Sequence, residues 1–484
     1  MSTMNREKFY STVDHLEDRF IDRLRRAVEI PSVSADGWRR SDVFKACELI
    51  ANEMQSLGID VKVKSLGKEP GTDLELPQLV LGRYGQDLAK PTVLVYCHYD
   101  VQPAAIEDGW KHDPFQLTVE QDGRLCGRGT SDDKGPLVAW LNMIEAFQKC
   151  GSEVPANLIF CFEGMEESGS VGLRAALEEE ASEFFADADV VCITDSIWAG
   201  NTQPSISRGL RGVLFYILTI TGAKQDAHSG IFGGRISEPM TDMVKVMSTL
   251  VDSNGKLLIP GIYDNVVPVT DAERELYQNM KISKEDLDGG LEGRSLHQDV
   301  ASNLVSRRMP ALSIHRIEST TAGEGATTSI PAGLRGKFSI RTVPNMKAAD
   351  VDSLVHEHIT AEFKRLESKN SMNLVCVHQS DWFYEDVNHW NHRAGVNAIE
   401  TVWKTKPDFI CEGGSIPIAL HFKEILKKNV LLLPVGKPTD GAHSINEVVP
   451  LEKLDKLNYV NSAKVYGTYL DELCRMQRAV HRID

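Results

Sequence analysis

Four short apolar runs, each followed by ionisable residues, constrain the fold of this chain more than any other feature. The runs and the groups behind them are 92–97 before His98 and Asp100, 157–162 before Glu166 and Glu167, 188–194 before Asp195, and 429–435 before a loop with His443. Runs that are apolar on both faces are typical of buried parallel strands. Helical spacing between them, as in residues 136–148, predicts an α/β fold with helices on both faces of a mostly parallel sheet. The ionisable groups would then gather at the carboxyl ends of the strands, where such sheets bind ligands.

A second domain is predicted between the third and fourth of these runs. After the glycine-spaced segment 207–212, the expected elements are a strand at 213–221, a helix at 238–251, a strand at 334–341, a helix at 348–366 and a strand at 373–377. This order predicts a small α+β sheet with helices on one face, if one more strand lies in the long irregular stretch to about residue 325. We therefore expect a catalytic domain of residues 1–207 and 384–484, interrupted by a smaller domain of residues 208–383.

The groups behind the strands have the composition of metal ligands. Two imidazoles and three carboxylates would meet, namely His98, Asp132, Glu167, Asp195 and His443. This mixed nitrogen and oxygen set suits zinc or manganese better than calcium or copper. Three carboxylates and a hydroxide are balanced by two divalent cations, whereas they would repel one another strongly without them. The sequence therefore predicts a site for two Zn²⁺ or Mn²⁺ ions.

Asp100 stands two residues after His98, and a ligating imidazole usually gives its other N–H to a carboxylate. We therefore expect Asp100 to orient His98. Taken singly, each residue has an ordinary alternative: Glu166 and Glu167 could form a solvated turn, and Asp132 could cap a helix. Their joint placement behind parallel strands favours the metal site.

Composition argues against several kinds of partner. The net charge of −16, without a compensating basic stripe, disfavours nucleic acid and anionic membranes. Nine scattered cysteines without a CxxC pair predict reduced thiols. The N-terminal 26 residues lack an apolar signal core, and no run approaches the length of a membrane span. We expect a cytoplasmic protein.

Together these motifs resemble the M20 metallopeptidases, in the branch of cytosolic nonspecific dipeptidases and carnosinases that includes fungal cysteinylglycine dipeptidases of glutathione breakdown. The resemblance covers nearly the whole chain. It rests on ordered motifs: His98-Tyr-Asp100, residues 127–135 (GRGTSDDKG), residues 163–169 (EGMEESG), Asp195, residues 227–230 (AHSG), residues 341–345 (RTVPN), residues 413–417 (GGSIP) and residues 440–443 (DGAH).

The resemblance implies roles for the catalytic residues. Asp132 would bridge the two ions, with the other ligands divided as His98 and Asp195 on one ion and Glu167 and His443 on the other. Glu166 would be the general base that takes a proton from the attacking water and passes it to the leaving amine.

The resemblance also implies substrate contacts and a homodimer. Arg341 would bind the C-terminal carboxylate of the substrate, with Thr328 and the backbone near Ser415 as further contacts. The inserted domain would be a lid that also dimerises, and His228 would reach the partner's site to stabilise the oxyanion. Each of these residues also has an ordinary alternative. Arg341 could be a surface strand residue, His228 an ordinary loop histidine and Thr328 a structural residue. Cys411 departs from the family, whose members commonly have Arg there, and this bears on side-chain preference.

The expected function is therefore hydrolysis of small unblocked dipeptides, Cys-Gly included, by a dinuclear metal-dependent dipeptidase. An N-acyl-amino-acid deacylase or amidohydrolase on the same scaffold is an alternative, because it would use the same metals and Arg341. A third reading is a non-catalytic binding protein on a degenerate hydrolase fold, which the complete set of ligands and base disfavours.

Overall fold

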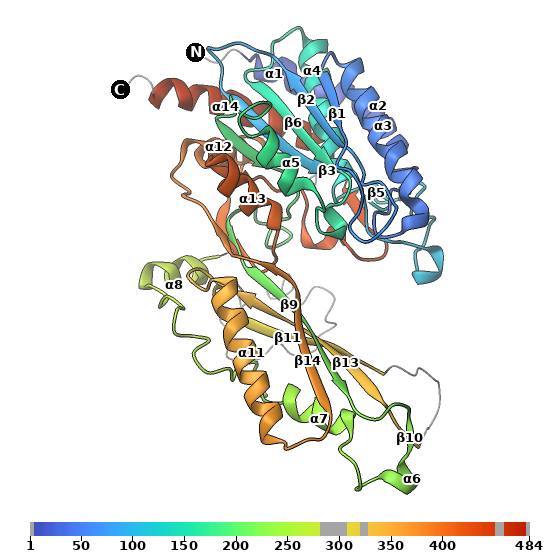
Figure 1. Cartoon of the computed structure of the whole chain (residues 1–484). Coiled ribbons are helices and arrows are strands. Elements are labelled where there is room, and N and C mark those ends of the chain that lie inside the picture. Colours follow the sequence, from blue (N-terminus) through green and yellow to red (C-terminus); the bar gives the residue numbers. More distant parts are fainter. Residues whose placement is uncertain (1–3, 281–306, 320–327, 451–458, 481–484) are drawn as a thin grey trace.

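The structure is a computed structural model that describes residues 4–280, 307–319, 328–450 and 459–480. Two sheets, stacked end to end in Figure 1, organise these residues. The large sheet has the order β1-β2-β6-β3-β7-β17-β8-β15, with β16 paired to β8. Its strands are β1 (Asp60–Lys64), β2 (Leu79–Tyr84), β3 (Thr92–His98), β6 (Asn157–Glu163), β7 (Val190–Ile193), β8 (Ser205–Leu210), β15 (Phe383–Tyr384), β16 (Asp408–Glu412) and β17 (Val430–Leu432).

The centre of the large sheet is parallel. Strands β6, β3, β7 and β17 run side by side in one direction, and β1 and β2 add antiparallel strands at one edge. Every residue of β3 and β6 is buried. These two strands therefore show the two-sided burial that their continuous apolar sequences predict.

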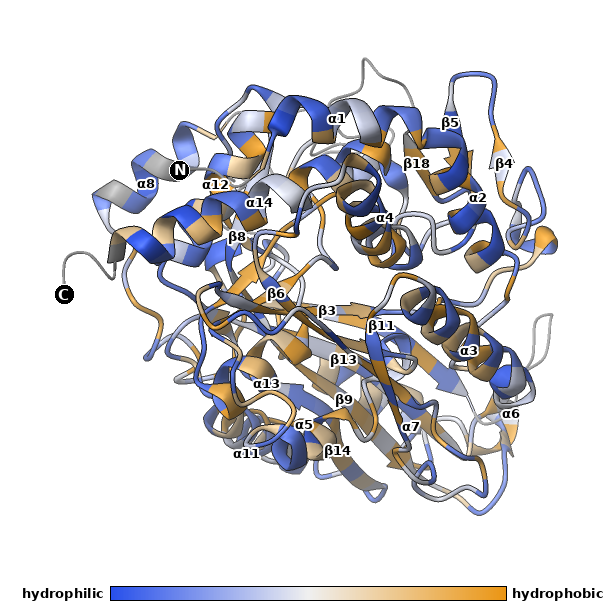
Figure 2. Cartoon of the chain, turned by 90° about the horizontal axis from the view of Figure 1, so that it is seen from above, coloured by the Kyte–Doolittle hydropathy of each residue, from blue (hydrophilic) through white to orange (hydrophobic). Residues whose placement is uncertain are grey.

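Helices cover both faces of this sheet. Val93 and Val95 of β3 point into a core built with α1 (Arg6–His15), α2 (Glu17–Val28), α3 (Arg40–Ser56), α4 (Lys134–Cys150), α12 (Trp390–Trp403) and α14 (Tyr459–Val480). Leu94 and Tyr96 point the other way, onto α5 (Leu173–Glu180) and α13 (Pro417–Leu426). In Figure 2 the hydrophobic colours concentrate on the central strands and on α4, which lies against them. The predicted α/β class is confirmed.

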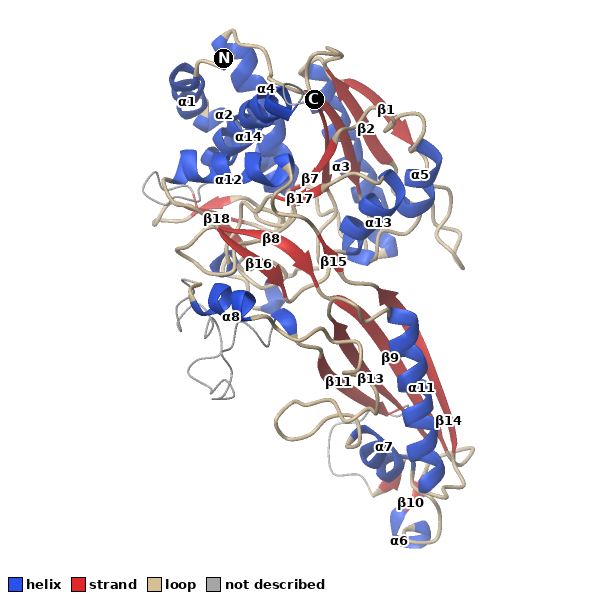
Figure 3. Cartoon of the chain, turned by 90° about the vertical axis from the view of Figure 1, so that its left-hand side faces the viewer, coloured by secondary structure: helices blue, strands red, loops and turns tan. Residues whose placement is uncertain are grey.

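The small sheet is antiparallel, with helices on one face (Figure 3). Its order is β11 (Ala311–Ser319), β13 (Gly333–Thr342), β9 (Gly212–Thr221) and β14 (Ser371–Ser380). Alternate residues of β9, from Leu214 to Ile220, are buried beneath α7 (Pro239–Met247) and α11 (Ala348–Arg365). Strand β11 is the additional strand expected in the long stretch. Residues 281–306 of that stretch lie outside the described part of the chain.

The chain passes from one sheet to the other through a single residue, Arg211, between the end of β8 and the start of β9. A side chain on Gly212 would lie 2.3 Å from Oγ1 of Thr342 and 2.6 Å from the carbonyl oxygen of Ser380. This close crossing therefore requires glycine. The expected domain boundaries fall within β8 and at β15, and they stay a prediction.

Several elements differ from their expected bounds. The strand expected at 429–435 is only Val430–Leu432, and the strand expected at 373–377 extends over Ser371–Ser380. The helix expected at 238–251 ends at Met247, where turns 248–250 follow. The strand expected at 188–194 is only Val190–Ile193. Among the described residues, no helix is long and apolar enough to cross a membrane.

Candidate active site

The ionisable groups predicted from the sequence meet at the carboxyl ends of the central strands. His98 is the last residue of β3, and Glu166 and Glu167 form a short turn three residues after β6 ends. Asp195 follows β7, and His443 lies in the loop after β17. Because β6, β3, β7 and β17 are parallel neighbours, their carboxyl ends bring these groups to one edge of the sheet.

The side chains form two adjoining groups of possible metal ligands. One ligand atom from each of His98, Glu166 and Asp195 lies within 4.8 Å of the others, and the same holds for Asp132, Glu167 and His443. Asp132 lies between the groups, because its Oδ1 is 3.1 Å from Nε2 of His98 and its Oδ2 is 3.0 Å from Nε2 of His443. This is the arrangement required of a carboxylate that bridges two ions.

The donor set fits divalent cations. Oε2 of Glu167 is 3.0 Å from Nε2 of His443, and Oδ2 of Asp195 is 3.9 Å from Nε2 of His98. Donor atoms around one ion with bonds of 2.0–2.1 Å are separated by about 3.4 Å. In the described part of the chain, no Lys or Arg forms an ion pair with these carboxylates or with those of Asp132 and Glu166. The site therefore gathers negative charge that cations would neutralise.

The electrostatics of the side chains reflect this crowding. Burial raises the pKa of Asp195 to about 7, against the opposing charge of His98. Hydrogen bonds to Asp132 and then to Glu167 raise the pKa of His443 to about 11. Without cations the imidazoles would hold protons, and ligation would release them.

Asp100 is fully buried and contacts both sides of the first group. Its Oδ1 lies 3.4 Å from Nδ1 of His98, and its carbonyl oxygen lies 3.0 Å from the same nitrogen. Its carboxylate also accepts hydrogen bonds from the backbone N–H groups of Glu166, at 3.2 Å, and Glu167, at 3.1 Å. Asp100 thus fixes the imidazole and the acidic turn together, which is more than the sequence predicted for it.

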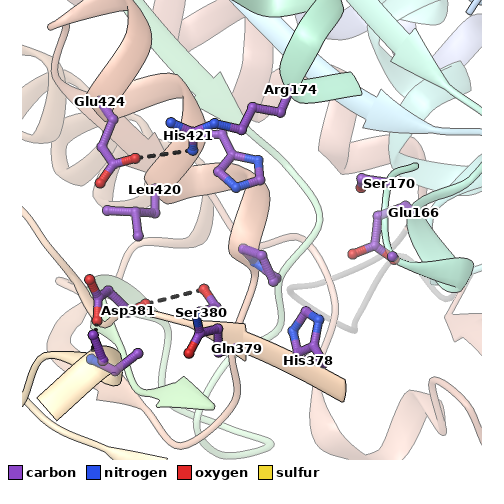
Figure 4. A pocket seen from close by; sticks show the side chains of 14 residues that line it. Glu166, Ser170, Arg174, His378, Gln379, Ser380, Asp381, Leu420, His421 and Glu424 are labelled. Atoms are coloured by element: carbon purple, nitrogen blue, oxygen red, sulfur yellow. Dashed lines mark hydrogen bonds and ion pairs between the residues drawn. The ribbon is translucent and has the colours of Figure 1, made fainter. Parts of the chain in front are cut away.

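Glu166 borders a cleft of about 320 Å³ between the two sheets (Figure 4). One wall comes from α5 and α13, where Arg174 and Glu424 form an ion pair of 3.2 Å. The other wall comes from the start of α11 and the end of β14, including His378. Burial and then the charge of Asp195 raise the pKa of Glu166 well above its usual range. A ligand in the cleft would therefore meet a carboxylate with a strong affinity for protons.

The expected substrate residues fall into two separate pairs. Nη1 of Arg341 donates to Oγ of Ser415 at 2.7 Å, near the junction of the sheets. His228 and Thr328 lie together, because strands β10 (Ala227–His228) and β12 (Ser329–Ile330) pair and Ser229 N donates to Thr328 O at 2.8 Å. This second pair lies at the end of the small sheet remote from the large sheet (Figures 1 and 3). Within one chain, His228 and Thr328 are therefore not brought to the metal ligands.

Cys411, where the resemblance predicted Arg, is buried in β16. A guanidinium still approaches this position, because Nη1 of Arg307 donates to the carbonyl oxygen of Cys411 at 3.1 Å.

Glu447 was not among the residues predicted from the sequence. Its fully buried carboxylate accepts hydrogen bonds from the N–H groups of Gly129 (3.0 Å), Ser131 (2.8 Å) and Asp132 (3.0 Å) and from Nη1 of Arg128 (2.8 Å). It therefore holds the loop that carries the bridging candidate. Its only sequence signal is its place four residues after His443.

Two further contacts were also missed. Nε2 of Gln102 donates to Oε2 of Glu167 at 2.7 Å, and Oδ2 of Asp133 accepts the backbone N–H of His98 at 3.0 Å. Gln102 and Asp133 lie inside or beside predicted motifs, but the sequence does not indicate which groups they contact.

Comparison with known proteins agrees with this geometry. Residues 94–468 match the model of the peptidase family M20/M25/M40. The chain is 47% identical over 474 residues to a Cys-Gly metallodipeptidase of Schizosaccharomyces pombe, with 97% of this chain and 98% of the relative covered.

Two solved structures have the same architecture. A di-peptidase of Saccharomyces cerevisiae superposes with a TM-score of 0.90 at 42% identity, covering 98% of this chain and 99% of that one. Human carnosine dipeptidase 1 also gives a TM-score of 0.90, at 36% identity, covering 98% of this chain and all of that one (100%).

Proposed function

The chain belongs to the peptidase family M20/M25/M40, and from this premise we propose that it is a dinuclear metallodipeptidase that hydrolyses unblocked dipeptides, Cys-Gly among them. The observation that carries the proposal is the position of Asp132, whose two oxygens face His98 and His443. The name of the Schizosaccharomyces pombe relative supports the choice of Cys-Gly as a substrate. A role in glutathione breakdown is part of the proposal.

Two divalent ions, zinc or manganese, would be held on either side of Asp132. The proposed ligands are His98 and Asp195 on one side and Glu167 and His443 on the other, with Asp132 shared. When bound, such a pair lowers the pKa of a coordinated water and polarises the carbonyl of the scissile bond.

Glu166 is the proposed general base. It lies beside His98 and Asp195 and borders the cleft, so it can take a proton from the attacking water and deliver it to the leaving amine. Asp100 supports this role by holding the backbone of the turn on which Glu166 stands. The proton-transferring carboxylate is thereby fixed relative to His98.

Arg341 is the proposed site for the substrate's C-terminal carboxylate. A guanidinium binds a carboxylate through two parallel hydrogen bonds, and only one of its donors is engaged with Ser415 among the described residues. A carboxylate required at a fixed place beyond the scissile bond would limit the substrate to short peptides.

A homodimer is also part of the proposal. The exposed position of His228, on the part of the small sheet remote from its own metal ligands, supports a role in a partner's site. There the imidazole would donate to the developing oxyanion, with Thr328 beside it. We place the enzyme in the cytoplasm, and nine free cysteines support a reducing compartment.

The test is amino-acid release from matched peptides by protein reconstituted with Zn²⁺ or Mn²⁺, with a chelated sample as control. Cys-Gly, other free dipeptides and their N-acetylated forms would be compared. We expect metal-dependent release from free dipeptides and little from acetylated ones. Preference for the acetylated forms would instead identify a deacylase, and the proposal would be wrong.

A further inference from the structure

The side chain of Arg341 is held by a short chain of hydrogen bonds that leads to Arg211. Oγ of Ser415 accepts from Nη1 of Arg341 at 2.7 Å and donates its single proton to the carbonyl oxygen of Arg211 at 2.5 Å. The hydroxyl is therefore engaged both as acceptor and as donor within the protein. The hydroxyl thereby orients the guanidinium of Arg341.

Arg211 also grips the loop on which Ser415 stands. Its Nε donates to the carbonyl oxygen of Gly413 at 2.9 Å, and its backbone N–H donates to the carbonyl oxygen of Gly414 at 3.1 Å. Neither glycine has a side chain to anchor this loop by packing, and Gly414 has open space around its Cα. The hydrogen bonds from Arg211 therefore tie this loop to the junction of the two sheets.

Arg211 lies at the junction of the two sheets, close to Arg341. It is the one residue between β8 of the large sheet and β9 of the small sheet. Arg341 stands on β13 directly opposite Val213 of β9, two residues from Arg211. The loop, the sheet junction and Arg341 are thus tied together at one point.

The surroundings favour an incoming anion. Burial and then the charges of Arg341 and Arg307 lower the pKa of Arg211 to about 10. Within the described ranges, no carboxylate forms an ion pair with Arg211 or Arg341. Arg211 and Arg341, which have no paired carboxylate among the described residues, favour an incoming carboxylate.

We propose that Arg211 is a positioning residue for substrate recognition: it fixes the 413–415 loop and, through the hydroxyl of Ser415, aims the guanidinium of Arg341 at the C-terminal carboxylate of the peptide. This inference rests on the proposed function, in which Arg341 binds that carboxylate. It adds the residues that make the binding specific for a free C-terminus.

The experiment uses Arg211→Lys, which keeps the charge but loses the planar Nε donor. The kcat and KM of the metal-loaded enzyme would be measured for Ala-Gly and for its C-terminal amide. For the free acid we expect KM to rise about tenfold with kcat within about twofold, because an interaction common to ground and transition states is weakened. For the amide, which lacks the carboxylate, kcat/KM should stay within about twofold.

Two further variants test the route. Ser415→Ala should reproduce the rise in KM, and the double variant should cost little more than either single change, because both act through one loop. Arg208→Lys is the matched control: this arginine lies three residues earlier on β8 and stacks on Tyr384 with 4.6 Å between guanidinium carbon and ring centre. Its KM for both substrates should match wild type.

The outcomes separate the inference from the function beneath it. If wild type itself hydrolysed acid and amide equally well, recognition of the carboxylate would be absent, and both the role of Arg341 and the inference would be wrong. If wild type preferred the acid but Arg211→Lys left KM unchanged, or weakened acid and amide equally, only the inference would be overturned. Thermal unfolding of each variant would identify one that fails to fold, and Ser415→Ala would then decide.

Discussion

The two oxygens of Asp132 face two different histidines, with Oδ1 3.1 Å from Nε2 of His98 and Oδ2 3.0 Å from Nε2 of His443. These histidines are 345 residues apart in the sequence. His98 ends β3, whereas His443 lies in the loop after β17. One carboxylate therefore joins the two halves of the candidate metal site.

Replacing this carboxylate should disable both halves together. In Asp132→Asn one oxygen is replaced by an amide nitrogen that has no lone pair available for an ion, so we expect fewer than about one ion per chain and at least a hundredfold loss of kcat/KM. Metal content by elemental analysis is the measurement. Asp242→Asn, which changes a buried aspartate of α7, should keep the wild-type metal content.

Glu447→Gln should weaken metal binding without removing any ligand. The amide would present an N–H group to the donors of Gly129 or Ser131, so the loop carrying Asp132 would shift. Competition with a chromogenic chelator should show affinity reduced by about 10- to 100-fold. Glu385→Gln alters another buried carboxylate that accepts from a backbone N–H, that of Val430, and should leave affinity unchanged. Equal effects in both variants would mean general destabilisation.

Glu163 should make the metal-free protein less stable as the pH rises. Burial raises its pKa to about 7 from the ordinary value of 4.5, although Tyr96 donates a hydrogen bond to it. Its folded-state proton therefore stabilises the protein fully below pH 4.5, and this contribution is lost as the pH rises through 7. Glu163→Gln cannot ionise, so between pH 5 and 8 wild type should lose roughly 2 kcal/mol of unfolding free energy relative to the variant. Urea unfolding in chelator is the measurement, and parallel pH profiles would contradict the expectation.

A trans contribution of His228 predicts complementation. Glu166→Gln lacks the base but retains His228, whereas His228→Ala retains the base but lacks the imidazole. If the subunits exchange at random, half of the dimers are mixed and each has one complete site, so the mixture should recover about one quarter of wild-type activity. No recovery from a mixture shown to contain mixed dimers would remove His228 from the partner's site.

Much of the large sheet could be predicted because its strands carry their environment in their own residues. The runs 92–97 and 157–162 carry apolar side chains on both faces, and every residue of β3 and β6 is buried. Strand β11 could not be located in this way. It lies at an edge of the small sheet with most of its side chains partly or fully exposed, so it has no continuous apolar signal.

The site residues also fall into those that the sequence predicts and those that it does not. His98, Glu167 and Asp195 lie at or within a few residues of the ends of central strands, so the strand order brings their backbones together. Asp132 and His443 lie in loops, and their motifs rather than a strand identified them. Glu447 and Arg211 act through loops distant in sequence: Glu447 binds the N–H of Asp132, 315 residues away, and Arg211 binds Gly413, 202 residues away. Partners of this kind depend on tertiary packing, which no local pattern encodes.

Glu166→Gln provides the most direct test of the central claim, that a metal pair held around Asp132 works with Glu166 to hydrolyse dipeptides. The variant and wild type would each be loaded with Zn²⁺ or Mn²⁺, their ions per chain counted, and their release of glycine from Cys-Gly followed. We predict two ions per chain in both proteins and a kcat at least about a hundredfold lower in the variant, because only the proton-accepting group is lost. Wild-type turnover by a variant that holds two ions per chain would contradict the account.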